Sequence, residues 1–357
     1  LHSPEKHCRK SRLYNTQVNR RHITMSLSDL ERRFINQYQG GFPLLEQPFR
    51  MVAADLGCSE RTLLDSISHL LDTGVLSRFG PLFDAVKLGG GLTLAAMSVP
   101  EEQFEHITDV VNACDEVAHN YRREHELNMW FVLATESPED IGNTLDRIEQ
   151  ATGLKIYNFP KLKEFYIGLC LHLDADDKVE TVPLPPASTA ATAAETTVYK
   201  LDELDRKIIA ASQAGLALTD CPFGVIAENS ACTSHEVKLR LENMLSSGII
   251  RRIGAVPNHY RLGLKANGMT VWDVADDQAD ELGMQIGQLD FVSHCYLRPR
   301  HLPVWRYNLF AMVHGHTRDE VNDKAEQIAS LLGDHCHAHE TLFSTAILKK
   351  TGMRLAA

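Results

Sequence analysis

The sequence predicts an α+β protein in which a winged helix-turn-helix and a ferredoxin-like domain occur twice in tandem. Segments 70–90 and 244–264 align at a constant shift, which matches Gly74 to Gly248. In the same alignment Arg78, Gly80 and Gly89 match Arg252, Gly254 and Gly263. Each repeat begins with helical periodicity and continues with alternating strand and helix patterns. A stretch rich in Ala, Thr and Pro, which is typical of a linker, separates the two repeats.

These patterns divide the chain into six segments. They are a disordered basic leader (1–25), winged helix 1 (26–90), ferredoxin-like domain 1 (91–173), a linker (174–200), winged helix 2 (201–263) and ferredoxin-like domain 2 (264–357). The leader is polar, basic and without periodicity, and we expect Met25 to be the true initiator; a nucleic-acid tail is the alternative.

Each winged helix is predicted from its periodicity and its caps. Residues 27–39 and 201–215 place Leu, Ile and Phe on one helical stripe. A short helix, a turn of small residues and a second helix follow, and the second helix starts at a cap residue, Ser59 or Thr233. A Gly ends that helix before an apolar strand, as expected for a helix-turn-helix with a wing.

The remainder of each repeat has the order strand, helix, strand, strand, helix, strand. In the first repeat, strand 92–100 precedes helix 101–114, and helix 137–153 follows the strand pair. The corresponding segments of the second repeat are 266–274, 276–289 and 317–333. This is the ferredoxin-like order, with helices on one face of the sheet and the other face free to pair with a partner sheet. We expect the repeats to pair as the subunits of a dimer would.

Composition restricts the function classes. A chain of 357 residues with 44% hydrophobic and 23% charged residues is ordinary for a soluble globular protein, and it lacks a bilayer-spanning run or secretory signal, so we expect it to be cytoplasmic. The net charge of -11 argues against DNA as the main partner. The eight Cys are scattered without a C-x-x-C pair, which favours reduced thiols over disulfides or a cysteine zinc site.

A helix-turn-helix followed by a ferredoxin-like domain resembles the Lrp/AsnC family of transcription regulators. The candidate recognition helices are nevertheless poor phosphate binders, because Arg61, Lys238 and Arg240 are balanced by neighbouring Glu and Asp. We therefore expect DNA binding to be absent and these helices to serve as packing and dimerisation modules.

Ionisable side chains recur at alternate positions before a core strand in both repeats. His119, Tyr121, Arg123 and His125 in the first repeat correspond in pattern to His294, Tyr296, Arg298 and Arg300 in the second, followed by Asn128 and Asn308. Alternate residues of a strand project from one face, so each repeat is predicted to present a polar face. A solvated sheet edge is the alternative, which the recurrence makes less favoured.

Segments 119–131, 295–315 and 341–354 resemble the siroheme decarboxylase family, with its D-type and L-type subunits joined in one chain. The resemblance implies non-oxidative loss of carbon dioxide from two acetate side chains of siroheme, which gives didecarboxysiroheme for heme d1 synthesis. It implies no added cofactor, because the iron is carried by the substrate. Other proteins of heme d1 synthesis are possible partners, and a regulator that senses a tetrapyrrole or another small ligand is the alternative function.

Siroheme carries carboxylates around its rim, so its site needs cations and a proton donor. The candidate substrate-binding residues are Arg122, Arg123, Arg298, Arg300, Arg306, Asn128, Asn308 and Trp305. We expect one histidine donor from each repeat, namely His125 in the first and His294, His301 or His314 in the second; His119 is the repeat equivalent of His294. Tyr121 and Tyr296 orient a carboxylate, donate a proton or pack, whereas Trp130 and Trp305 flank the macrocycle or fill the core.

A zinc site is a further possibility at His335, His337 and His339, which alternate along the chain. No metal-hydrolase motif accompanies them, so we expect a structural or incidental role and no metal site. A contact between a histidine and the iron of bound siroheme stays open.

Overall fold

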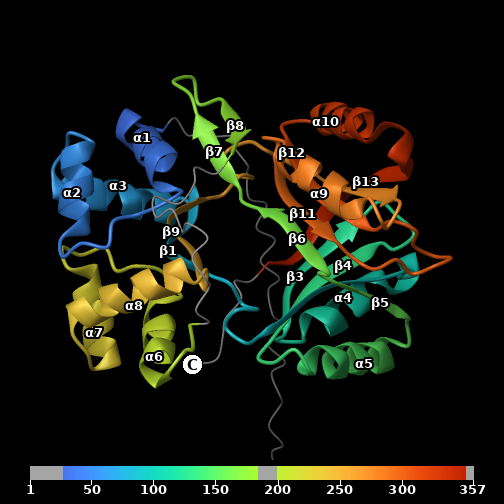
Figure 1. Cartoon of the computed structure of the whole chain (residues 1–357), viewed down its shortest axis with the longest axis horizontal. Helices are drawn as coiled ribbons and strands as arrows, with labels where there is room; N and C mark the ends of the chain where they lie inside the picture. Colours follow the sequence, from blue (N-terminus) through green and yellow to red (C-terminus); the bar gives the residue numbers. More distant parts are fainter. Residues whose placement is uncertain (1–26, 184–198, 351–357) are drawn as a thin grey trace, which may run out of the picture.

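The computed structural model describes residues 27–183 and 199–350. Winged helices occupy one side of the molecule and a large curved sheet with its covering helices occupies the other (Figure 1). The predicted leader and most of the predicted linker lie outside the described residues.

The two winged helices have matching elements. The first contains α1 (Asp29–Tyr38), α2 (Pro48–Asp55), α3 (Glu60–Asp72) and β1 (Leu76–Phe83). The second contains α6 (Glu203–Ser212), α7 (Pro222–Ser230), α8 (Ser234–Ser246) and β9 (Ile250–Pro257). The predicted caps are present, because the side chains of Ser59 and Thr233 accept hydrogen bonds from the first turns of α3 and α8.

The wings pair with each other, which joins the winged helices into one unit. Strands β1 and β9 are antiparallel, with Gly80 opposite Gly254. Arg78 Nη1 donates to the carbonyl of Gln213, 3.0 Å away, at the end of α6, and Arg252 Nη1 donates to the carbonyl of Gln39 at the end of α1. Each repeat thus supplies a cation to the helix C-terminus of the other, where carbonyls lack partners within the helix. One hydrophobic core spans both winged helices.

Replacing Arg252 with methionine should destabilise this unit. Arg252 is buried and also donates to the carbonyl of Ala255 at 3.0 Å. Loss of these charge-assisted bonds is expected to cost about 2–3 kcal/mol, which lowers the thermal unfolding midpoint by about 5–10 °C. Arg61→Met, at an exposed position on α3, is the control and should leave the midpoint unchanged. Equal midpoints for the two variants would contradict the prediction, and differential scanning calorimetry provides the measurement.

The ferredoxin-like order is confirmed in both repeats. The first contains β2 (Gly91–Met97), α4 (Phe104–Asn112), β3 (Val117–Arg123), β4 (Met129–Thr135), α5 (Asp140–Thr152) and β5 (Ile156–Pro160). The second contains β10 (Ala266–Val274), α9 (Ala279–Gly287), β11 (Val292–Leu297), β12 (Leu309–Gly315), α10 (Arg318–Leu332) and β13 (Cys336–Lys350). Short 3-10 turns lie at Glu101–Gln103 and Gly333–His335.

Strand exchange joins the two domains into a nine-stranded sheet of order β5-β2-β4-β3-β13-β10-β12-β11-β6. Strand β6 (Lys163–Ile167) follows the first domain in sequence but pairs with β11 of the second. Strand β13 pairs with β10 of its own repeat through its first part and with β3 through its last part. The predicted boundaries 91–173 and 264–357 therefore need correction, because each segment contributes a strand to the other domain.

The predicted linker begins too early, because a hairpin occupies its start. Strands β7 (Cys170–Leu173) and β8 (Val179–Val182) pair with each other, and Val179 is buried against the winged helices. The Gln39 side chain on the end of α1 exchanges two hydrogen bonds with the backbone of Leu171, at 2.6 and 3.0 Å. Local composition suggested a linker, whereas these backbone bonds fix the hairpin on the first winged helix.

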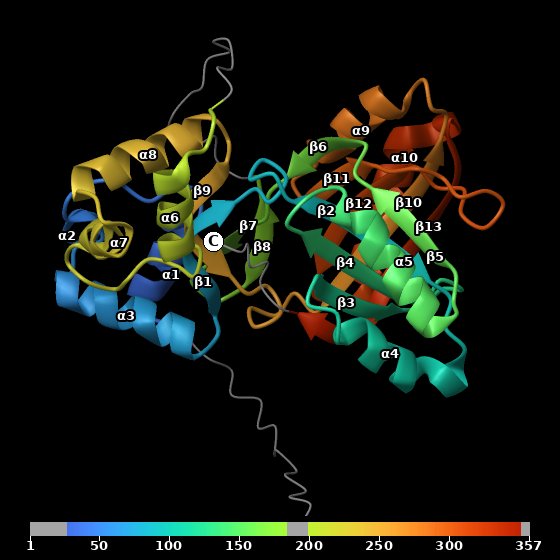
Figure 2. The same cartoon turned by 90° about the horizontal axis from the view of Figure 1, so that it is seen from below.

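The inner faces of the two domains pack against each other, as Figure 2 shows from a second direction. Their shared core includes Trp130 and Phe159 from the first repeat and Met269 and Phe310 from the second. Helices α4 and α5 cover the outer face of one domain, and α9 and α10 cover that of the other. Among the described residues, no helix is long and apolar enough to cross a membrane.

Candidate functional site

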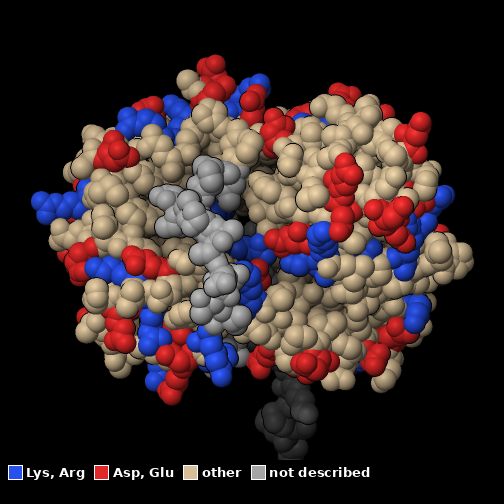
Figure 3. Space-filling view, viewed as in Figure 1, with Lys and Arg blue, Asp and Glu red and all other residues tan. Residues whose placement is uncertain are grey.

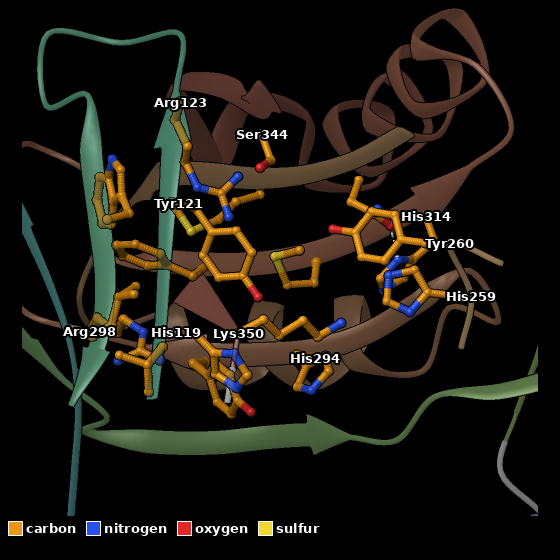
Figure 4. Close-up of a pocket in the computed structure, with 18 residues that line it drawn as sticks. His119, Tyr121, Arg123, His259, Tyr260, His294, Arg298, His314, Ser344 and Lys350 are labelled. Atoms are coloured by element: carbon orange, nitrogen blue, oxygen red, sulfur yellow. Dashed lines mark hydrogen bonds between the residues drawn. The ribbon is translucent and has the colours of Figure 1, made fainter. Parts of the chain in front are cut away.

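A cavity of about 280 Å³ lies between the inner sheet faces, beside their shared core. Both repeats contribute to its wall (Figure 4). The lining residues are Leu94, His119, Tyr121, Arg123, Trp130, Val132, His259, Tyr260, Asn267, Met269, His294, Tyr296, Arg298, Phe310, Met312, His314, Ser344 and Lys350. As far as the described residues form it, this lining contains cations, imidazoles and phenols but no Asp or Glu, so its chemistry favours an anionic ligand.

Two repeat-related arginines provide buried positive charge. Arg123, at the end of β3, donates to the carbonyl of Leu342 at 2.6 Å, and Arg298, just after β11, donates to the carbonyl of Phe159. Each guanidinium is therefore held by the opposite repeat, while its Nε atom is buried and has no partner among the described residues. Burial lowers the pKa of Arg123 and of Arg298 to about 10, so both remain cationic at neutral pH. A carboxylate is the natural partner for such buried charges.

The repeat-related histidines His119 and His294 both line the cavity, as the alternation predicted. Burial lowers the pKa of each to about 4, with a further contribution from the positive charge of Lys350 at His119. Both rings are therefore neutral at physiological pH in the unliganded protein. Negative charge placed beside them would raise their pKa values and favour proton uptake.

Tyr121 and Tyr296 also face the cavity and keep their phenolic protons. Burial raises the pKa of Tyr121 to about 12 and raises that of Tyr296 further. The guanidinium carbon of Arg298 lies 5.0 Å from the ring centre of Tyr296, and that of Arg123 lies 5.8 Å from the ring centre of Tyr121. Both phenols can thus donate hydrogen bonds to a ligand and support the cations.

The second repeat adds a polar cluster that sequence reasoning largely missed. His259 and Tyr260 follow wing strand β9, and the ring of His259 lies 4.9 Å from that of His314. Burial lowers the pKa of His259 to about 4 and that of His314 well below its ordinary value. The amine of Lys350 lies 5.1 Å from the Tyr260 ring centre.

A signal for this cluster was present in the repeat alignment. His259 and Tyr260 align with Ala85 and Val86, so a polar pair replaces an apolar pair immediately after the wing. The signal was weak without the fold, since the wing is remote from the polar strands in sequence. No comparable signal in the sequence marked Lys350, because its position in the site depends on the pairing of β13 with β3, where it lies opposite His119.

Two predicted proton donors, His125 and His301, do not line the cavity. Strand β3 ends at Arg123, so the alternation of side chains stops before His125, whose Nδ1 accepts a bond from Leu127 N at 2.9 Å. The His125 ring packs against Trp305. His301 Nε2 lies 2.7 Å from the carbonyl oxygen of Asn158 at the edge of the hydrophobic core. His314, the third predicted alternative of the second repeat, does line the cavity.

Three predicted substrate-binding arginines are occupied elsewhere. Arg122 points to the opposite side of β3 from Arg123 and pairs with Glu101. Arg300 and Arg306 share Asp273, at 2.9 and 2.7 Å. Alternation fails for Arg300 because β11 ends at Leu297, and a buried carboxylate holds both guanidinium groups away from the cavity.

The repeated asparagines are structural. Asn128 bonds through its side-chain amide to the backbone N–H and carbonyl of Val99, both at 2.8 Å. Asn308 makes the same pair of bonds to Val274, at 3.2 and 3.0 Å. Their recurrence reflects a shared strand connection, since each satisfies backbone groups at the end of a neighbouring strand.

The two tryptophans that were expected to flank the macrocycle or fill the core, Trp130 and Trp305, differ in position. Trp130 lines the cavity on β4, whereas Trp305 is 1% exposed and packs within the shared core against Trp130, with ring centres 5.1 Å apart. Trp305 therefore fills the core beneath the site and does not itself form the cavity wall.

The alternating histidines near the C-terminus do not converge. His335, His337 and His339 are exposed, and His339 stacks on Trp272 with ring centres 4.7 Å apart. The described part of the chain holds no group of three His, Cys, Asp or Glu residues arranged for a metal ion.

The cations of the recognition helices are in ion pairs. Arg61 pairs with Asp65 at 3.0 Å, Lys238 pairs with Glu46, and Arg240 lies between Asp202 and Asp205. On the face drawn in Figure 3, acidic and basic side chains are interspersed over the winged helices. Such pairing leaves little free positive charge for a phosphate backbone.

The neutral histidines predict a loss of stability in mild acid. An unfolded histidine takes up a proton below about pH 6.5, whereas His119, His259 and His294 resist protonation down to about 4. Stability is therefore fully present above about pH 6.5 and falls as the pH approaches about 4. We expect the thermal midpoint to drop less between about pH 7 and about pH 5 in His294→Gln than in wild type.

The control for this measurement is His106→Gln, at an exposed position on α4. It should retain the wild-type pH dependence of the midpoint. Identical curves for wild type and His294→Gln would contradict the prediction.

The fold and the cavity define a protein of the AsnC-like class, with ligand-binding domains that enclose a cavity lined by cations and imidazoles. The family model described as AsnC-like ligand binding domain matches residues 87–166 and 261–349. A second model, described as siroheme decarboxylase NirDL-like HTH domain, matches residues 31–76 and 205–251. The chain belongs to the siroheme decarboxylase family, as the following similarities establish.

A siroheme decarboxylase of Hydrogenobacter thermophilus is 32% identical over 323 residues, which cover 88% of this chain and 92% of the relative. A siroheme decarboxylase NirH subunit of Paracoccus pantotrophus is 57% identical over 43% of this chain and 96% of its own length. The crystal structure of the siroheme decarboxylase NirDL superposes with a TM-score of 0.68 at 28% identity, over 92% of this chain and 94% of that one. The crystal structure of siroheme decarboxylase NirDL in complex with an iron-uroporphyrin III analogue superposes with a TM-score of 0.65 at 29% identity. The match covers 90% of this chain and 92% of that one. The predicted family is thus confirmed.

Proposed function

We propose that this chain decarboxylates siroheme in the cavity between its repeats, where it removes two acetate carboxyl groups to form didecarboxysiroheme. The observation that carries the proposal is a cavity that combines buried arginines with neutral histidines, and whose described lining residues include no carboxylate. A solved relative was crystallised with an iron-uroporphyrin III analogue, which supports a tetrapyrrole as the ligand. The product would serve later steps of heme d1 formation.

Arg123 and Arg298 hold carboxylates of the substrate that do not react. Their Nε atoms are buried and lack partners in the described part of the chain, and both guanidinium groups remain charged at neutral pH, so carboxylates would complete their hydrogen bonding. Because each arginine is anchored to the opposite repeat, the substrate would be held across the junction of the two sheets. Tyr121 and Tyr296 would donate further hydrogen bonds.

The reaction breaks the bond between the methylene carbon and the carboxylate carbon. Carbon dioxide leaves, and the electron pair stays on the methylene carbon, where the conjugated macrocycle delocalises it. One proton then bonds to that carbon and gives a methyl group. The apolar wall beside the cations, which includes Leu94, Val132 and Phe310, would remove water from the scissile carboxylate. This would favour its departure as neutral carbon dioxide, with the negative charge moved to the methylene carbon and the macrocycle.

We assign the proton transfers to His119 and His294, one from each repeat. Both line the cavity, and a bound polycarboxylate would raise their low pKa values toward neutrality. Substrate binding would therefore favour protonation of the two histidines that donate protons in the reaction. The balanced reaction transfers no electron to or from an external partner. We therefore propose that no added cofactor takes part, with the iron present as a component of the substrate.

A DNA-binding regulator that senses a tetrapyrrole is less well supported. The candidate DNA contacts Arg61, Lys238 and Arg240 are in ion pairs, and the two wings pair with each other. The similar full-length proteins are decarboxylases. These observations favour the enzyme.

The test is anaerobic incubation of the purified protein with siroheme, followed by mass analysis of the tetrapyrrole. We expect the loss of two carbon dioxide units in wild type, with no added cofactor. An Arg123→Met, Arg298→Met double variant should return the siroheme unchanged at a concentration that saturates wild type. Siroheme recovered intact from the wild-type protein would overturn the proposal.

A further inference from the structure

A chain of hydrogen bonds extends from one cavity histidine into the protein. Ser293 Oγ lies 2.8 Å from His294 Nδ1 and 2.7 Å from His314 Nε2. His314 Nδ1 in turn contacts the side-chain oxygen of Asn267. Ser293 is 2% exposed and does not itself line the cavity, so it acts only through its neighbours.

A β-bulge explains how Ser293 reaches both rings. The register of β11 against β12 shifts between Val292 and His294, so the backbone at Ser293 departs from regular alternation. Bulges of this kind redirect side chains beside functional sites. The hydroxyl of Ser293 thereby lies between two imidazoles, while the carbonyl of Met312 is more distant at 3.4 Å.

The direction of each hydrogen bond in this series follows from Asn267, where the series ends. The Asn267 oxygen only accepts, so His314 Nδ1 carries a proton and its Nε2 is an acceptor. Ser293 then donates to His314 Nε2 and accepts from His294 Nδ1–H. His294 Nε2 is consequently the nitrogen with a free lone pair, which is the less common neutral form of histidine. It is therefore the atom at which His294 takes up and releases a proton.

The first repeat has the bulge without the hydrogen-bonded chain. The register of β3 against β4 shifts between Val117 and His119 in the same way, but the residue there is Ala118. By strand pairing, the positions of His314 and Asn267 correspond to Ala134 and Leu92. His119 Nδ1 is buried and has no hydrogen-bond partner within residues 27–183 and 199–350. The two repeats thus share the bulge and the histidine, but they differ in the side chains that would orient the histidine ring.

We infer that Ser293 is a positioning residue which, with His314 and Asn267, holds His294 as the Nδ1–H form with Nε2 ready for proton transfer. His119 has no such support from the part of the chain that the structure describes. This inference rests on the proposed function. It makes the two repeats chemically unequal, with His294 as the better prepared donor. Hydrogen-bond partners of this kind orient metal-ligating imidazoles, where their loss typically costs about 10- to 100-fold in affinity or activity, and we expect a loss of rate of the same order here.

The experiment combines spectroscopy and turnover on the full chain. Protein with 15N-labelled histidine is examined by NMR without substrate, and the His294 signals are assigned by their loss in His294→Gln. We expect the Nδ1–H form in wild type and a shift toward the Nε2–H form in Ser293→Ala. With siroheme as substrate, Ser293→Ala should lower kcat by about 10- to 100-fold and change KM little. Ser293→Thr retains the hydroxyl and should recover most of the lost rate.

Ser212→Ala is the matched control. Ser212 is a fully buried serine of α6 whose hydroxyl bonds to the carbonyl of Ile208 at 2.7 Å, away from the cavity. It should leave both the His294 signals and kcat unchanged. The inference fails if wild-type His294 is in the Nε2–H form, or if Ser293→Ala turns over siroheme at the wild-type rate. If wild type leaves siroheme intact, the proposed function fails instead, and the NMR result still tests the hydrogen-bonded chain.

Discussion

Replacing His294 with alanine is expected to lower the rate of siroheme decarboxylation by about 10²- to 10⁴-fold, the contribution of a positioned proton donor. His294 lines the cavity, and its Nδ1 is held by Ser293. Its removal leaves the developing charge on the methylene carbon without a nearby acid, so the chemical step slows. Substrate affinity should change by less than about tenfold, because the arginines supply most of the attraction.

Single-turnover kinetics under anaerobic conditions measure this effect, and an absorbance titration with siroheme measures affinity separately. The matched control is His125→Ala, since His125 packs against Trp305 outside the cavity lining. It should retain nearly the wild-type rate. A large loss in His125→Ala together with an active His294→Ala would reverse the assignment and restore the donor that sequence spacing favoured.

Replacing Arg298 with methionine should weaken siroheme binding by about 10- to 100-fold, in line with about 1.5–3 kcal/mol for a charge-assisted bond. The unliganded protein should show the opposite trend in stability. The Arg298 guanidinium is costly to desolvate, because it is buried and its Nε has no partner among the residues that the structure describes. Methionine is therefore expected to leave the thermal midpoint unchanged or higher. Weaker binding with undiminished stability is the signature of a residue kept for the ligand.

Arg122→Met is the control for Arg298→Met and for the equivalent Arg123→Met. Arg122 neighbours Arg123 in sequence but points away from the cavity and pairs with Glu101 at the surface. It should bind siroheme as wild type does, in isothermal titration calorimetry. Equal losses in Arg122→Met and Arg123→Met would indicate a general effect of positive charge and would contradict a specific cavity contact.

The sequence alone determined the repeat, the order of elements and part of the site. The aligned glycines and arginines identified the duplication, and cap residues such as Ser59 and Thr233 marked helix starts, because capping is a local interaction. Alternation correctly placed His119, Tyr121 and Arg123 on one face, and likewise His294, Tyr296 and Arg298, since these residues lie within or directly beside regular strands.

Spacing stopped being informative where the strands end. His125 and Arg300 continue the alternation in sequence, but the chain has already turned at both positions. The ion pairs that Arg300 and Arg306 form with Asp273 could not be predicted from the sequence either, because these residues come together only in the folded protein. A local sequence pattern specifies the face of a strand on which a side chain lies, but not the residue with which that side chain pairs in the folded protein.

Tertiary structure decided the rest of the site. The pairing of β13 with β3 brings Lys350 beside His119, and the paired wings direct His259 and Tyr260 into the cavity. It also brings His314 and Asn267 to Ser293, which links these side chains to His294. These relations depend on backbone pairing between segments far apart in the chain, whose free energy is set by long-range packing, and so no local sequence pattern specifies them.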